Sequence, residues 1–115
     1  MEEIKKLFTE IDGALKDNPE QVKGVQAVYQ FNFHEDESTV FQLVLNGENS
    51  YTTEGKKESP DCTLTMLKED FLAMAKGELN GTRAFMSGRL RIKGNMGLAL
   101  KLQSILATYN QTKNL

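Results

Sequence analysis

Hydrophobic residues open the chain at helical spacing and then change to the spacing of a strand. Apolar side chains recur every three or four residues at the start: Ile4, Leu7, Phe8, Ile11 and Leu15. This pattern predicts an amphipathic helix that ends at Asn18 and Pro19. Residues 27–34 instead alternate apolar and polar side chains, which is typical of a half-buried strand.

The next segment predicts a meander of short strands. Residues 35–38 are too polar to pack and predict the turn into a second strand over residues 39–45. An Asn-Gly dipeptide then reverses the chain into a third strand near Tyr51. After a loop over residues 55–60, alternating apolar side chains predict a fourth strand: Cys62, Leu64 and Met66.

The second predicted strand is apolar on both of its faces. Val40 and Val44 share one face, whereas Phe41, Leu43 and Leu45 share the other. If helices cover a single face of the sheet, a second copy of the chain could cover the opposite face. We therefore predict a homodimer through this strand; the alternative is a central strand that is covered on both sides within one chain.

The second half of the chain predicts two helices, a strand and a long final helix. In the helix over residues 69–76 the apolar side chains share one face, and Asp70 falls on the opposite, polar face. A short helix over residues 82–87 precedes a strand over residues 89–93. Asn95 is a good N-cap for the last helix, which is apolar around most of its circumference. Such breadth indicates two apolar partners: the core, and another helix, another chain or a ligand.

Length and composition narrow the class of protein. The order of elements predicts an α+β domain with a mostly antiparallel sheet, and 115 residues fit one domain spanning residues 1–115. Cys62 is the only cysteine and excludes an internal disulfide, while no apolar run approaches the length of a membrane span. We therefore expect a cytoplasmic protein. The net charge of −2 argues against nucleic-acid binding.

The charge is unevenly distributed along the chain. Residues 1–50 carry 4 basic and 10 acidic side chains, whereas residues 81–101 carry 5 basic and no acidic ones. Because side chains alternate across a strand, Arg89, Arg91 and Lys93 share one face of the last predicted strand. We predict that they form a positive strip that contacts anionic lipid head groups or an anionic membrane. The alternative is a charged outer face that is only solvated.

The sequence contains few residues that could act in catalysis. His34 is the only histidine and lies beside an acidic turn, where weak cation binding is less favoured than a solvated turn. Cys62 falls on an apolar strand face and is expected to be an inert thiol. Gly94 and Gly97 fit no phosphate-binding or dinucleotide motif, and we interpret them as turn and close-packing glycines. We predict no catalytic residues, no cofactor and no metal site.

The second half of the chain resembles the sterol carrier protein 2 family. Three short stretches carry the resemblance: DCTLTM at residues 61–66, EDFLAM at residues 69–74 and GELN at residues 77–80. The longer stretch AFMSGRLRIKGNMGLALKLQ at residues 84–103 resembles the family's signature, which joins its last strand to its last long helix. Leu67 and Gly81 depart from the family, which often has Ser or Thr and Pro at these helix starts. Neither departure removes an apolar position.

The resemblance implies a five-stranded sheet with helices packed on one face and an apolar tunnel between the two layers. Such a tunnel accepts fatty acyl chains, acyl-CoA or sterols, and we expect a stand-alone domain that binds and transfers such lipids without catalysis. Methionine adapts its shape to different ligands, so the methionines of the second half suit this role, although they could equally fill the core. The predicted lipid contacts, with Gln103 as the polar one, are Phe71, Met74, Phe85, Met86, Met96, Leu100, Gln103 and Leu106.

A second function, of a different class, is compatible with the same residues. The chain could be an accessory or assembly domain that recruits a protein partner through its apolar surface and has no physiological lipid. Extraction of the purified protein and mass spectrometry of the extract distinguish the two functions.

Overall fold

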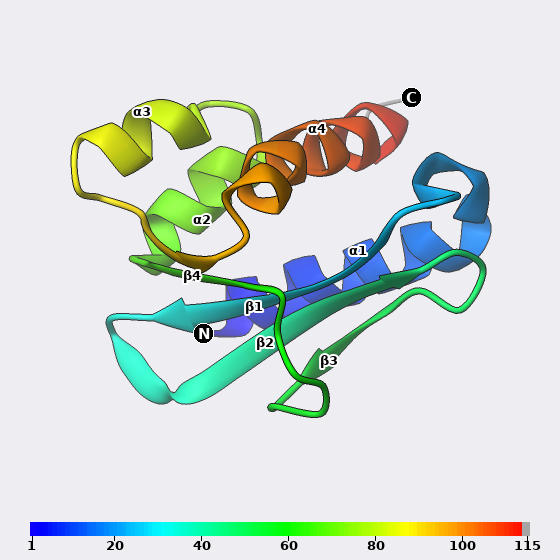
Figure 1. Cartoon of the computed structure of the whole chain (residues 1–115), viewed down its shortest axis with the longest axis horizontal. Coiled ribbons are helices and arrows are strands. Elements are labelled where there is room, and N and C mark those ends of the chain that lie inside the picture. Colours follow the sequence, from blue (N-terminus) through cyan, green and yellow to red (C-terminus); the bar gives the residue numbers. More distant parts are fainter. Residues whose placement is uncertain (114–115) are drawn as a thin grey trace.

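The computed structural model describes residues 1–113, and the side chains as far as residue 107. The α-helices and strands follow one another in the order that the hydrophobic pattern predicts (Figure 1). They follow in this order: α1 (Glu2–Asp17), the 3-10 turn η1 (Pro19–Val22), β1 (Gln26–Phe33), β2 (Asp36–Asn46), β3 (Tyr51–Glu54), β4 (Cys62–Met66), α2 (Lys68–Ala75), α3 (Gly81–Met86), β5 (Arg91–Gly94) and α4 (Met96–Lys113).

The strands form one five-stranded sheet in the order β3-β2-β1-β4-β5. Strand β1 pairs antiparallel with β2 and parallel with β4, and the two outer pairs are antiparallel. The α+β class and the mostly antiparallel five-stranded sheet are therefore confirmed. The parallel pair arises because the connection from β3 to β4 crosses β2 and β1 before the chain re-enters the sheet.

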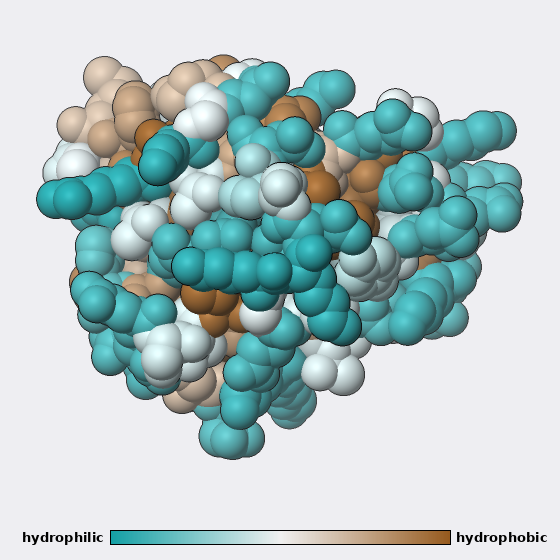
Figure 2. Space-filling view, turned by 60° about the horizontal axis from the view of Figure 1, so that its bottom comes forward, coloured by the Kyte–Doolittle hydropathy of each residue, from teal (hydrophilic) through white to brown (hydrophobic). Residues whose placement is uncertain are grey.

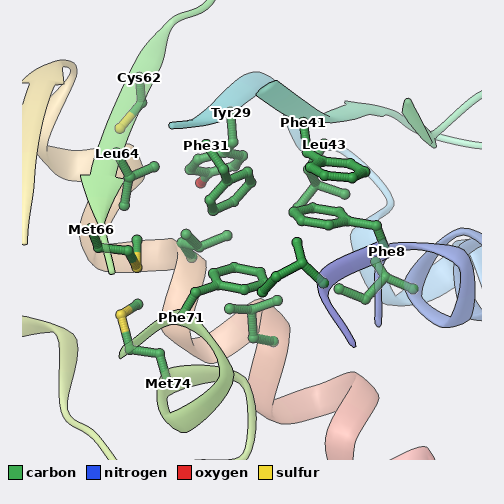
Figure 3. Packing of buried hydrophobic residues seen from close by; sticks show 14 of the residues in the cluster. Phe8, Tyr29, Phe31, Phe41, Leu43, Cys62, Leu64, Met66, Phe71 and Met74 are labelled. Atoms are coloured by element: carbon green, nitrogen blue, oxygen red, sulfur yellow. The ribbon is translucent and has the colours of Figure 1, made fainter. Parts of the chain in front are cut away.

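The helices cover one face of the sheet, and the core lies between the two layers. The register places Phe31 of β1 opposite Phe41 of β2 and Leu64 of β4, so these side chains point toward the helices. Phe8 of α1 stacks on Phe41 and Phe71, with ring centroids 4.5 and 5.2 Å apart (Figure 3). This aromatic cluster fills the space between α1, α2 and the sheet.

The connection over residues 55–61 covers the opposite face of β2. Gln42 is fully buried there; its amide donates to the Glu58 carbonyl and accepts from the Glu58 N–H, at 2.8 and 3.0 Å. Val40 and Val44 are each only 7% exposed. Figure 2, which brings the bottom of the view in Figure 1 forward, shows a mostly hydrophilic surface with small hydrophobic areas. The premise of the predicted homodimer, an apolar face of β2 left bare by its own chain, is therefore wrong; self-association itself stays a prediction.

Several element boundaries differ from the sequence predictions. Strand β2 begins at Asp36, whose carboxylate accepts hydrogen bonds from Ser38 and Thr39. These hydrogen bonds hold the pKa of Asp36 below its usual value. Strand β5 begins at Arg91, two residues later than predicted. Gly94 is a close-packing glycine, as predicted: its φ is +104°, and an added Cβ would collide with the carbonyl of Asp61.

Candidate functional site

The candidate site is the seam between α3 and α4. Gln103 of α4 joins its two sides: its Oε1 accepts from the Gly81 N–H at 2.7 Å, and its Nε2 donates to the Leu79 carbonyl at 3.1 Å. We call this pair of bonds the Gln103 clasp. Both polar atoms of the side chain are thus bound to the backbone around the start of α3. Its hydrogen-bond partners in this structure belong to the protein, and the role of Gln103 as the polar contact of a lipid stays a prediction.

Helix geometry identifies the apolar side chains that line the seam. Phe85 lies one turn after Gly81 on α3, and Met96 and Leu100 lie two turns and one turn before Gln103 on α4. Because Gly81 and Gln103 are in contact, these three apolar side chains lie along the facing sides of the two helices. They are 41%, 42% and 61% exposed, respectively. The seam is therefore an apolar strip that the protein leaves partly uncovered.

Beneath the seam, α2 and α4 contribute side chains to the core between the helix layer and the sheet. Phe71 and Met74 of α2 and Leu102 and Leu106 of α4 are all buried. In Figure 3 Met66 and Met74 occupy the same side of the cluster as β4, away from Phe8. The predicted lipid contacts thus divide into a buried group (Phe71, Met74, Leu106) and a group at or near the surface (Phe85, Met86, Met96, Leu100, with Gln103 between them).

Helix α3 is the least firmly held part of this layer. Its only buried side chain is Ala84. The Asn80 side chain accepts from the Thr82 and Arg83 N–H groups and so caps its start. Gly88, with φ +81°, follows its C-terminal end. Polar bonds at its two ends, rather than apolar burial, therefore fix its position.

At the C-terminal end of α3, an ion pair joins Arg89 to Asp70 of α2. The Arg89 Nη2 lies 2.5 Å from the Asp70 Oδ1, and the hydrogen bond and charge of Asp70 raise the pKa of Arg89. Asp70 is only 5% exposed, although the helical pattern placed it on a polar face. The predicted three-residue strip was wrong in one member, because Arg89 precedes β5 and turns toward Asp70. Arg91 and Lys93 do share the strand face opposite the helices.

Sequence reasoning missed Tyr29 as a fixing point of α4. This side chain is fully buried, and its hydroxyl donates to the Leu98 carbonyl at 2.6 Å. Burial, and then the nearby Cys62 and Asp61, raise the pKa of Tyr29 to about 12. An aromatic residue on an apolar strand face carries no sequence signal for such a contact, because the carbonyl lies 69 residues away. The bond anchors the first turns of α4 to the sheet.

The described residues offer little reactive chemistry at the seam. Within residues 1–113 no group of three His, Cys, Asp or Glu side chains is arranged to hold a metal ion. Cys62 is buried, and desolvation raises the pKa of its thiol, which opposes formation of the thiolate. His34 is exposed at the end of β1. In the same described part of the chain, none of the helices has the length and apolar character needed to cross a membrane.

In a comparison with known protein families, residues 5–107 match the SCP-2 sterol transfer family. Hydroxysteroid dehydrogenase-like protein 2 of Danio rerio is 41% identical over 107 residues. The alignment covers 90% of this chain and 25% of that protein. The chain therefore corresponds to about a quarter of that relative.

Solved structures share the fold. Sterol carrier protein 2 from Yarrowia lipolytica, in its apo form, superposes with a TM-score of 0.74 at 26% identity, covering 90% of this chain and 89% of that one. Palmitated SCP2L2 from Aedes aegypti superposes with a TM-score of 0.62 at 26% identity, covering 84% and 91%, respectively. These two proteins of similar length therefore have the same sheet and helix layer as this chain.

Proposed function

Because this chain belongs to the SCP-2 sterol transfer family, we propose that it binds a long-chain lipid non-enzymatically and carries it between lipid environments. The ligand would lie under the seam between α3 and α4, with its chain between the helix layer and the β4–β5 side of the sheet. Fatty acids and fatty acyl-CoA are the favoured ligands, with sterol-like molecules as a further class. A cytoplasmic location stays a prediction.

The partly uncovered apolar strip carries the proposal. Burial of apolar surface stabilises a protein by about 25 cal/mol per Å². The three large apolar side chains along the seam are 41% to 61% exposed, so a lipid chain that covers them would gain this stabilisation. Met74 of α2 lies close to Gly81 at the start of α3, and Met96 is the first residue of α4; methionine adapts to ligands of different shape. The Aedes aegypti neighbour is a palmitated protein, which supports a fatty acyl chain as ligand.

The Gln103 clasp suggests how a lipid enters. Helix α3 is held by one buried alanine, the clasp and the Arg89–Asp70 pair. Breaking these few polar bonds would therefore allow α3 to move away from α4 and open the seam. Methylenes lose little free energy on moving from a bilayer to an apolar site, which favours reversible loading. Affinity would come from chain burial, and the clasp would regulate access.

Lipid extraction tests the proposal. The protein is purified without detergent and extracted with organic solvent, and the extract is compared by mass spectrometry with that of an unrelated protein from the same host. We expect fatty acids or other single-chain lipids in stoichiometric amounts. A protein without bound lipid, which also fails to bind added fatty acid, would instead support the accessory-domain function.

A further inference from the structure

Helix α2 has no capping side chain of its own. Its first residue is Lys68, and Leu67, which occupies the N-cap position, makes no side-chain hydrogen bond. The N–H groups of Asp70 and Phe71 donate to the Leu67 carbonyl, both at 3.1 Å. The N–H groups of Lys68 and Glu69 come before this turn of the helix, so their partners have to lie outside the helix.

A carboxylate from the turn between β1 and β2 supplies one of these partners. Both oxygens of Glu35 accept from the Lys68 N–H, at 3.1 and 3.0 Å. A negative charge is favourable there, because the first N–H groups of a helix carry partial positive charge. The sheet explains the contact: β1 and β4 are parallel neighbours, with Phe33 in register with Met66. Glu35 and Lys68 each follow two residues later, so both leave the sheet at the same end.

The turn presents Glu35 in a fixed position. On one side of it, the His34 N–H donates to the Met66 carbonyl at 3.1 Å and joins the turn to the end of β4. On the other side, the Asp36 carboxylate accepts from the N–H and the hydroxyl of Ser38. The Glu35 side chain is exposed, but the backbone on both sides of it is held by hydrogen bonds.

Helix α2 connects this turn with the seam. Asp70, in the first turn of α2, pairs with Arg89 beyond the C-terminal end of α3. Near the other end of α2, the Met74 methyl lies beside the start of α3, 3.6 Å from where a Cβ on Gly81 would be. Figure 1 shows α2 below α3, toward the sheet. A shift of α2 therefore disturbs both ends of α3.

We propose that Glu35 is a positioning residue of the seam: its bond to Lys68 holds α2 in place, and α2 in turn keeps α3 closed against α4. Loss of the bond frees the first turn of α2, weakens the Asp70–Arg89 pair and lets α3 open more often. A bound lipid then enters and leaves faster, while its affinity changes little because the closed form still predominates. This consequence for lipid exchange rests on the proposed function, whereas the coupling between Glu35 and α3 does not.

Hydrogen exchange followed by NMR tests the coupling in the full chain without lipid. The test variant is Glu35→Ala, and the control is Glu37→Ala, which removes the same charge from an exposed position two residues later. In Glu35→Ala we expect the Lys68 amide to exchange about fivefold faster, as after the loss of a helix cap, and the Gly81 amide about threefold faster. Adding Leu67→Ser, which supplies a local cap, should restore the Gly81 rate but leave Lys68 fast. Amides of the β1–β2 pair and all amides of the control should exchange as in wild type.

Three results would overturn the proposal: an unchanged Gly81 rate in Glu35→Ala, equal acceleration in Glu35→Ala and Glu37→Ala, or equal acceleration of the β1–β2 amides, which indicates a general loss of stability. If Glu35→Ala does not fold, Leu67→Ser alone takes its place and should slow Gly81 exchange; an unchanged rate would again overturn the proposal.

Transfer of a fluorescent fatty acid from the protein to phosphatidylcholine vesicles tests the consequence for exchange. Transfer from Glu35→Ala should be about threefold faster than from wild type, with the equilibrium affinity within about twofold. Equal transfer rates would overturn the role of Glu35 in exchange. A wild-type protein that binds no fatty acid but shows the Lys68 and Gly81 effects would refute the proposed function and support the coupling.

Discussion

Replacement of Gln103 by methionine tests the clasp between α3 and α4. The substitution keeps a long unbranched side chain with good helix propensity but removes the bonds to Gly81 and Leu79, which measure 2.7 and 3.1 Å. A typical hydrogen bond contributes about 1 kcal/mol, so Gln103→Met should lower the free energy of unfolding by about 2 kcal/mol. For a domain of this size the melting temperature should fall by about 8 °C.

Two measurements separate this effect from a general loss of packing. Thermal unfolding followed by circular dichroism gives the melting temperature, and Gln26→Met, at an exposed position at the start of β1, is the matched control. Hydrogen exchange of the Gly81 amide, whose acceptor is removed, should accelerate by about thirtyfold in Gln103→Met. If Gln103→Met melts like the control and Gly81 remains protected, the clasp does not hold α3 and the proposed entry route is wrong.

Three further predictions concern the elements around the seam. Gly94→Ala should destabilise the protein by at least about 2 kcal/mol in denaturant titrations, because φ is +104° and the new Cβ meets the backbone of Asp61; an unchanged midpoint would contradict the close approach. The raised pKa of Tyr29, about 12 in the folded state against 10.0 normally, predicts that the free energy of unfolding falls as pH rises from 10 to 12, since the unfolded chain releases this proton first. Tyr29→Phe should weaken that pH dependence in denaturant titrations, leaving the part that comes from the raised pKa of Cys62, and a wild-type profile in the variant would exclude Tyr29 as a source. Arg89→Met should lower the melting temperature because it leaves the buried Asp70 carboxylate unpaired, and Asp70→Asn in the same chain should restore part of the loss; no change in either variant would show that the pair does not stabilise α3.

Local patterns were sufficient to predict most of the elements. Alternation in residues 27–34 and the helical spacing of residues 4–15 report which side faces the core, and both elements form where predicted. Local patterns could not predict that a loop covers the face of β2 that points away from the helices. A polar loop over residues 55–60 has no apolar periodicity, yet its backbone bonds to Gln42 close the second face of the sheet.

The polar contacts of the site depended on pairs that are distant in sequence. Gln103 binds groups 22 and 24 residues away, and Arg89 binds Asp70 across 19 residues. Sequence reasoning named Gln103 as the polar contact of the predicted lipid site but gave no information on its partners within the protein. It also assigned Asp70 to solvent, because an acidic residue beside Glu69 gives no sign that a distant arginine will neutralise it.

Titration of the folded protein with fluorescent fatty acids of increasing chain length tests the central claim most directly. If the ligand is held by burial of methylenes at about 0.8 kcal/mol each, two added carbons should tighten binding by about fifteenfold until the site is full, after which the affinity should level off. Affinity that is independent of chain length, or no binding at any length, would contradict the role of this chain as a lipid carrier.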